Sequence, residues 1–142
     1  MNIVPFRPEH LTALKLQPAQ TWMQPMVKEE AYVRMLEACD SYTALLDFRV
    51  VAIAGLVRIW PGRAHLSALL ADDISHAFIQ LHREVERRLQ ASTLHRIEAT
   101  VDGGFEAAHR WMRMLDFKLE TPDGMRGYMP NGGTSYLYAR VR

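Results

Sequence analysis

The sequence predicts an α+β fold built on one mixed β-sheet. Apolar residues make up 49% and charged residues 23% of the 142 positions, which is typical of a soluble globular domain. Strand-like and helix-like periodicities alternate along the chain. Three consecutive strand-like segments precede a long amphipathic helix, which predicts an antiparallel first half followed by a helical crossover between Ala71 and His95. Because no repeat or linker interrupts this order, we expect residues 1–142 to form a single domain.

The first half alternates short helices with β-rich segments. Pro8 suits the first turn of a helix, Pro61–Gly62 marks a turn, and Gly55 within a strand suggests a bulge. A tight turn is expected at Arg49. The expected elements are strands at Asn2–Phe6, Ser41–Phe48, Val50–Trp60 and Arg63–Ala71, helices at Glu9–Leu16 and Val27–Ala38, the latter with Val27, Ala31, Met35 and Ala38 at helical spacing, and a loop at Gln17–Pro25.

The second half begins with a helix that Asp72 or Asp73 can cap. Glu84 and Arg88 form an i,i+4 pair on this helix. Its apolar face consists of Ile74, Ala77, Phe78, Leu81, Val85 and Leu89. The remaining expected elements are a strand at His95–Val101, a break at Gly103–Gly104, a helix at Phe105–Leu115, and strands at Phe117–Thr121 and Thr134–Arg142. The total is about six to seven strands and about four helices.

Composition and charge restrict the partners. A net charge of +1 gives no strong attraction to nucleic acid. No apolar run is long enough for a membrane span, and the start lacks a secretory pattern. A single cysteine, Cys39, excludes an internal disulfide, so we expect a reducing cytoplasm or assembly into a particle there. His82 and Glu86 lie one helical turn apart, but two further ligands are missing, so no metal is expected.

The stretch "RIEATVDGGFEAAHRWMRMLDFKLET" resembles the last helix and strand of the GNAT superfamily, the acyl-CoA N-acyltransferases. "HRIEATV", "HRWMRMLDF" and "YLYARV" resemble, more narrowly, the small GNAT-like proteins encoded by bacteriophages. The resemblance implies that the fourth and fifth strands, Arg63–Ala71 and His95–Val101, run parallel and splay apart at their C-terminal ends. It also implies that the pantetheine arm of acetyl-CoA lies between them.

The residues that this resemblance places against the cofactor are Leu69, Leu70, Ala71, Ser75, His76, Ala77 and Thr100. In the family, a glycine-containing turn and a helix N-terminus bind the pyrophosphate through backbone amides, since free amides and the helix dipole favour an anion. Here the turn has Asp72 and Asp73 and no glycine, so we expect a degenerate pyrophosphate loop that binds acetyl-CoA weakly. Met112 stands where many members have a tyrosine acid, and Asp116 where many have glycine.

Three side chains are candidates for proton transfer, and each has a structural alternative. Glu98 or His65 could accept a proton from an amine. The structural alternative, which we favour, is that Glu98 forms an ion pair with Arg96 or with an arginine of the neighbouring strand and that His65 is a hydrogen-bonded or exposed histidine. His109 could replace the missing tyrosine as an acid, or belong to the edge of an apolar stripe that includes Met112.

Two functions therefore remain open. The first is an acetyl-CoA-dependent N-acyltransferase that acts on an amine acceptor in the host cytoplasm. The second is a non-catalytic GNAT-fold protein of a bacteriophage virion that contacts other virion subunits or copies of itself. "TWMQPMV", with Trp22, Met23 and Met26, offers a contact surface for the second, or a lid folded on the core.

Overall fold

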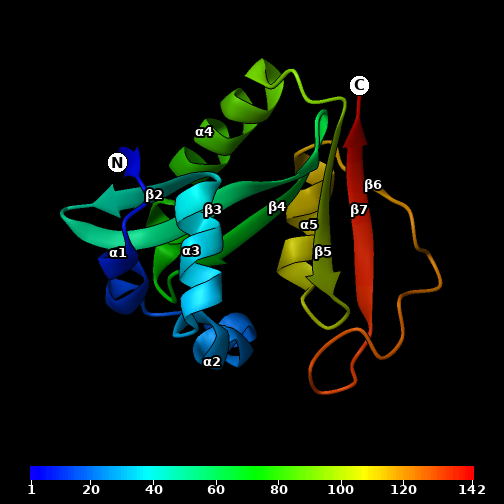
Figure 1. Cartoon of the computed structure of the whole chain (residues 1–142), viewed down its shortest axis with the longest axis horizontal. Helices are drawn as coiled ribbons and strands as arrows, with labels where there is room; N and C mark the ends of the chain where they lie inside the picture. The colour runs from blue at the N-terminus through cyan, green and yellow to red at the C-terminus, as the bar shows by residue number, and fades with distance from the viewer. The chain divides into compact units, whose positions relative to one another are not determined.

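The computed structural model describes all residues, 1–142, and its fold is α+β (Figure 1). The strands form a seven-stranded mixed sheet in the order β1-β2-β3-β4-β5-β7-β6. They are β1 (Asn2–Pro5), β2 (Asp40–Leu46), β3 (Arg49–Trp60), β4 (Arg63–Leu70), β5 (Arg96–Asp102), β6 (Lys118–Leu119) and β7 (Ser135–Val141). The helices are α1 (Pro8–Ala13), α2 (Gln24–Val27), α3 (Glu30–Ala38), α4 (Phe78–Ala91) and α5 (Glu106–Met114), with 3-10 turns η1 (Pro18–Met23) and η2 (Ile74–His76).

The chain divides into two compact units, and the first comprises Met1–Val57 and Leu66–Ser92. In it, β2 pairs antiparallel with both β1 and β3. Helices α3 and α4 cover opposite faces of these strands. Tyr32 of α3 lies beside Ser67 of β4, whereas the adjacent Leu66 lines a pocket together with Val85 and Leu89 of α4. Because neighbouring residues of a strand point to opposite faces, α3 and α4 must lie on different sides.

The second unit comprises Arg58–His65 and Thr93–Arg142. The start of β4 pairs in parallel with β5, from Arg63 opposite Arg96 to His65 opposite Glu98, which confirms the predicted parallel pairing. Strand β7 lies antiparallel between β5 and the short β6 (Figure 1). Helix α5 packs on this sheet through a hydrogen bond between His109 and Tyr138 of β7.

The predicted helix at Val27–Ala38 was wrong in its start and in its apolar face. The structure places α2 at Gln24–Val27 and starts α3 only at Glu30. Leu36 is buried and Tyr32 partly buried, whereas Ala31 and Ala38 are exposed, so the inward face follows the i,i+4 pair Tyr32 and Leu36. The helix expected at Glu9–Leu16 is shorter in the structure, where α1 ends at Ala13. The predicted loop at Gln17–Pro25 contains the turn η1.

The hairpin between β2 and β3 turns at Asp47–Phe48, one residue before the predicted position at Arg49. Both residues have positive φ, 49° and 65°, as a two-residue turn that follows the strand twist requires. The side chain of Phe48 is 97% exposed. The pairing of β3 with β2 is regular at Gly55, and its irregularity falls between Ala44 and Leu45. The strand expected at Phe117–Thr121 is reduced to Lys118–Leu119.

Asp116 adopts the left-handed conformation that glycine favours, with φ of 64°. It follows the end of α5, where Phe117 N–H donates to Met112 C=O at 2.9 Å and Asp116 N–H donates to Arg113 C=O at 3.0 Å. This pair of bonds is a Schellman motif, which satisfies two terminal carbonyl groups of the helix. The missing glycine therefore did not change how the helix ends.

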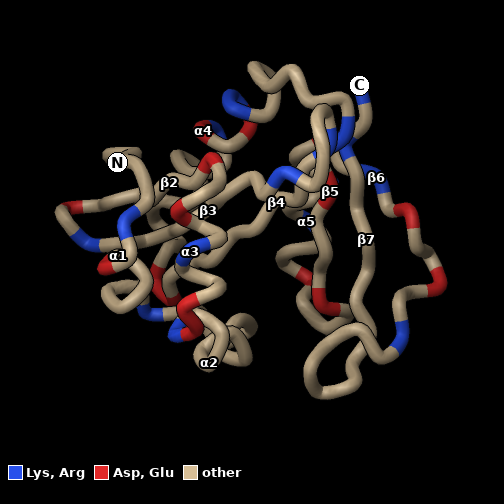
Figure 2. The backbone as a smooth tube through the Cα atoms, viewed as in Figure 1, with Lys and Arg blue, Asp and Glu red and all other residues tan.

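Basic and acidic residues are interspersed along the chain (Figure 2). Every helix is too short or too polar to cross a lipid bilayer.

Candidate functional site

The candidate site begins where β4 loses its pairing with β5. The paired positions end at His65 and Glu98, although β4 continues to Leu70. The backbone groups of successive strand residues point alternately to the two edges of a strand. Because Ala71 N–H donates to Val51 of β3 at 2.9 Å, Leu70 and Ala68 present their backbone groups to the opposite edge. This is the edge at which the sequence analysis expects the pantetheine arm.

The chain's own Lys15–Gln20 segment covers this edge. The side chain of Gln20 donates to Ala68 C=O at 2.8 Å and accepts from Leu70 N–H at 2.9 Å. Gln17 N–H donates to Leu70 C=O at 3.0 Å, and Asp72 N–H donates to Lys15 C=O at 3.0 Å. The side-chain amide of Gln20 thus bonds the edge of β4 as a neighbouring strand would. Together with Lys15 and Gln17, it supplies partners for backbone groups of Ala68, Leu70 and Asp72.

The two carboxylates of the turn after β4 are each paired with a cation. Asp72 lies 3.1 Å from Lys15 Nζ, and Asp73 forms an ion pair with Arg49. These pairs are partly exposed, so each contributes little to stability. They do reduce the electrostatic repulsion that two bare carboxylates would exert on a pyrophosphate.

The residues expected at the cofactor divide by exposure. Leu69, Leu70, Ala71 and Ala77 are buried, while Ser75 and His76 are exposed on η2. Helix α4 begins at Phe78 without a side-chain cap. Thr100 lies on β5 opposite Leu137 and is partly exposed. In the turn before α4, Ala77 N–H donates to Ile74 C=O at 2.7 Å, so it is not a free donor for an anion.

Glu98 is buried and both of its oxygens accept hydrogen bonds from arginine. Arg63 Nη2 donates to Oε1 at 2.6 Å and Arg96 Nε donates to Oε2 at 2.8 Å. Arg96 also binds Glu120 through both terminal nitrogens, at 3.0 and 2.5 Å. Hydrogen bonding to Arg63 and then to Arg96 lowers the pKa of Glu98, despite the opposing effect of burial. A carboxylate with a lowered pKa and two guanidinium partners is a weak proton acceptor.

His65 stands directly opposite Glu98 in the β4–β5 pairing, so the structure brings these two candidate bases together on one face. Burial lowers the pKa of His65, and the proximity of Glu98 only partly offsets this effect. The imidazole is therefore neutral at pH 7, which is the form that a general base needs.

His109 lies on the other face of the same strands. It contacts Tyr138, which pairs with Ala99, and Ala99 points away from Glu98. Both of its ring nitrogens are used, because Nδ1 lies 2.8 Å from Tyr138 Oη and Nε2 lies 3.1 Å from Asp102 C=O. Since a carbonyl can only accept, Nε2 carries the proton and Nδ1 accepts from the tyrosine. Met112, one turn along α5 toward the C-terminus, is buried with 5% exposure, which confirms its expected place in the core.

Tyr32 is a candidate that the sequence analysis missed. Its hydroxyl oxygen is buried and has no hydrogen-bond partner, a rare situation that calls for an explanation. Burial raises the pKa of Tyr32, while the nearby Ser67 partly offsets the rise although the pair does not reach hydrogen-bond geometry. Ser67 is two residues beyond His65 on β4 and faces the same side. The signal in the sequence was the i,i+4 spacing of Tyr32 and Leu36, which the predicted stripe overlooked.

No family model and no curated protein sequence matches the chain. Solved structures do. An acetyltransferase of the GNAT family from Bacillus anthracis is 15% identical with a TM-score of 0.68 over 98% of this chain and 93% of that chain. A ribosomal-protein-alanine N-acetyltransferase from Brucella melitensis is 15% identical with a TM-score of 0.70 over 100% of both chains. A ribosomal alpha-N-protein acetyltransferase in complex with coenzyme A is 16% identical with a TM-score of 0.72 over 98% and 92%.

These likenesses establish that the fold is that of the GNAT acetyltransferases. They do so over nearly the full length of the chain. No group of three or more histidine, cysteine or acidic side chains is arranged to hold a metal ion.

Proposed function

We propose that the protein is an acyl-CoA-dependent N-acyltransferase in which the Lys15–Gln20 segment closes the cofactor edge of β4 in the free protein. The observation that carries the proposal is the pair of hydrogen bonds from Gln20 to Ala68 and Leu70. A polar side chain there keeps the edge in a hydrogen-bonded state that a pantetheine amide could take over. A non-functional edge would need no such replaceable partner, since ordinary strand pairing or an apolar cover would suffice.

The residues of the site fit an acyl-CoA on one condition, which is that Gln20 leaves the edge. Ala68 and Leu70 would then offer a carbonyl and an amide to the pantetheine arm, and the N–H groups of Ser75 and His76 would offer backbone donors to the pyrophosphate. Acyl-CoA supplies an activated acyl group for transfer to an amine. His65 would accept the proton of that amine, and coenzyme A would leave as its thiolate, which takes a proton from solvent.

Calorimetric titration with coenzyme A tests the proposal. We expect the wild type to bind with a Kd no tighter than roughly 100 μM, about −5.5 kcal/mol. Gln20→Ala removes two hydrogen bonds that compete with the ligand, each worth about 1 kcal/mol, so binding should tighten by roughly 30-fold. Gln90→Ala, the same change at an exposed position of α4, is the matched control and should leave the Kd unchanged. Absence of binding by Gln20→Ala at millimolar coenzyme A would refute the proposal.

A double substitution in the turn after β4 provides an independent test. Replacement of both Asp72 and Asp73 by glycine should also tighten binding, because Lys15 and Arg49 would be released to attract the pyrophosphate. If neither this variant nor Gln20→Ala binds, the second function becomes the better account.

That second function is a non-catalytic GNAT-fold subunit of a bacteriophage virion or another assembly. Trp22 lies on η1, the turn that also contains Gln20, and Met26 lies on α2. Each of these two side chains is 40% exposed, whereas Met23 is buried. Exposed tryptophan and methionine are enriched at protein interfaces. This function predicts a change in tryptophan fluorescence on assembly that Trp22→Ala abolishes.

A further inference from the structure

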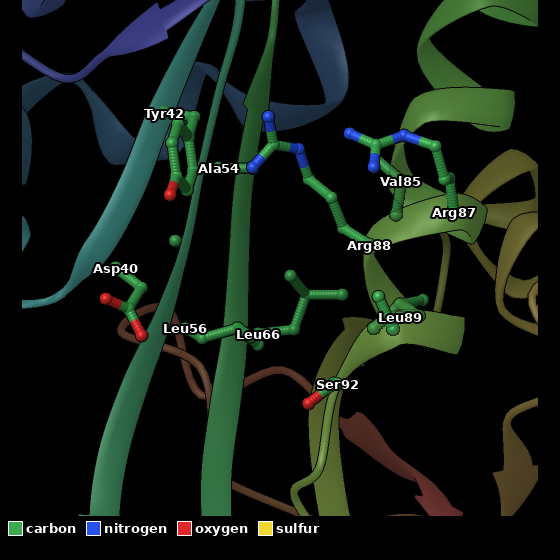
Figure 3. A pocket seen from close by; sticks show the side chains of 12 residues that line it. Asp40, Tyr42, Ala54, Leu56, Leu66, Val85, Arg87, Arg88, Leu89 and Ser92 are labelled. Atoms are coloured by element: carbon green, nitrogen blue, oxygen red, sulfur yellow. The ribbon is translucent and has the colours of Figure 1, made fainter.

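A pocket of about 420 Å³ lies between α4 and the strands of the first unit (Figure 3). Its volume falls within the roughly 300–1,000 Å³ range of small-molecule sites, at the lower end. Apolar side chains form its inner part, and two arginines of α4 stand along one side. The residues that line it include Tyr42, Leu56, Leu66, Val85, Arg87 and Arg88.

This pocket is separate from the cofactor edge. It is formed by the second half of α4, from Val85 onward, whereas the turn expected at the pyrophosphate precedes Phe78. At 1.5 Å per residue, Arg88 lies about 15 Å along the helix from its first residue. Leu66 points into the pocket, and it faces away from Ser67 and Tyr32 because neighbouring strand residues alternate.

The basic side of the pocket carries an excess of positive charge. Glu84 is the shared partner of both arginines, binding Arg87 through two nitrogens at 3.1 and 2.7 Å and Arg88 Nε at 2.6 Å. Two guanidinium groups against one carboxylate leave one positive charge there. Asp40 also lines the pocket, from β2 two residues before Tyr42 (Figure 3).

Tyr42 fixes the direction in which Arg88 points. The guanidinium carbon of Arg88 lies 4.0 Å from the centre of the Tyr42 ring, across the pocket from the helix (Figure 3). This cation–π contact holds the positive group over the opening, and the bond to Glu84 uses only its Nε–H. Guanidinium groups held in this way bind carboxylates with directed hydrogen bonds.

We infer that the pocket binds a small monocarboxylate with a compact apolar or aromatic body. The carboxylate contacts Arg87 and Arg88, and the body lies against Leu56, Leu66 and Val85 beside the Tyr42 ring. The inference is independent of acyl transfer, since no residue of the cofactor edge takes part.

Titration with 3-phenylpropionate, followed by calorimetry or by NMR shifts, tests this site. We expect saturable binding with a Kd of roughly 0.1–1 mM, in the range open to a ligand of this size. The neutral analogue 3-phenylpropan-1-ol should bind at least about 10-fold more weakly, because it cannot form the charged hydrogen bonds. Equal binding of acid and alcohol, or no saturation at 10-fold above the expected range, would overturn the inference.

Variants locate the site. Arg88→Gln should weaken binding of the acid by about 10-fold or more. If Arg88→Gln melts at a lower temperature than wild type, Arg87→Gln serves as the second variant and should weaken binding to the same extent. Arg83→Gln changes an exposed arginine of the same helix that does not line the pocket, so its Kd should equal that of wild type. Binding that survives both pocket variants would show that the acid binds elsewhere and would refute the assignment.

Discussion

Glu98 and Tyr32 are both polar side chains buried against the sheet, yet their surroundings differ in a decisive way. Glu98 has a guanidinium on each oxygen, and Arg96 extends the network to Glu120. The Tyr32 hydroxyl has no hydrogen-bond partner at all. A fully bonded group lowers the energy of the folded state, whereas a buried group without a partner raises it. The Glu98 carboxylate is therefore part of a bonded network within the second unit, whereas the Tyr32 hydroxyl is a local cost to the folded state.

The same contrast separates Glu98 from the β4 edge. Hydrogen bonds to Glu98 are charged and buried, so no ligand displaces them at modest cost. Hydrogen bonds from Gln20 to Ala68 and Leu70 are neutral and come from one side chain, which a ligand amide can replace.

The largest expected effect is at Glu98. Glu98→Gln leaves Arg63 and Arg96 without their buried anion and should lower the free energy of unfolding by about 3–5 kcal/mol. Because the pKa of Glu98 is lowered in the folded state, its contribution is present at neutral pH and is lost as the pH falls below the ordinary value of about 4.5. Denaturant titrations at several pH values should therefore show a flatter acid dependence in the variant.

Glu84→Gln is the matched control for that experiment, since Glu84 binds two arginines on the helix surface. It should cost less than about 1 kcal/mol. An equal loss in both variants would contradict the distinction drawn between the buried network and the surface pair.

The second prediction concerns Met112, which occupies the place of a catalytic tyrosine in the family resemblance. Met112→Ala should destabilise the protein by about 2–5 kcal/mol through the cavity it leaves in the core. Met114→Ala, at a position that is 55% exposed on the same helix, should change stability by less than about 0.5 kcal/mol. Unchanged thermal melting of Met112→Ala would show that this side chain is not part of the core.

The third prediction concerns a substitution that should stabilise the protein. Tyr32→Phe removes a buried hydroxyl that has no partner, so stability should rise by about 1 kcal/mol. Tyr138→Phe removes a hydroxyl that bonds His109 at 2.8 Å, and stability should fall by about 1–3 kcal/mol. Chemical denaturation of the two variants measures both changes. If Tyr32→Phe is destabilised as much as Tyr138→Phe, the Tyr32 hydroxyl has a hydrogen-bond partner in solution.

The smallest effect is expected at Asp116, where the backbone and not a side chain is strained. Asp116→Gly relieves the left-handed conformation after α5 and should raise stability by about 0.4–1 kcal/mol, net of the entropy that glycine loses. Asp116→Ala keeps the Cβ and removes the carboxylate, so it separates charge from conformation and should not stabilise. An equal gain in stability in both variants would show that the carboxylate of Asp116, and not its backbone conformation, destabilises the wild type.

Much of the fold followed from local patterns in the sequence. The apolar face of α4 and the burial of Met112 were predicted correctly, because hydrophobic periodicity reports which side of an element faces the core. The parallel pairing of β4 with β5 was also predicted correctly, but from the resemblance to the GNAT superfamily. Boundaries were less accurate. The helix at Val27–Ala38 divided into two, since Ala31 and Ala38 fit an apolar stripe by composition but lie on the exposed side.

The sequence alone determined the order of elements, the absence of glycine in the turn after β4 and the apolar stripe that contains Met112. Tertiary structure decided which polar groups have partners. Gln20 and Ala68 are 48 residues apart, and Arg63 and Glu98 are 35 apart, so no local pattern connects them. The pairing of Asp72 with Lys15 and of Asp73 with Arg49 depends in the same way on the folded chain. Hydrogen bonds and ion pairs require atoms within a few ångströms, and only the packed sheet brings these residues that close.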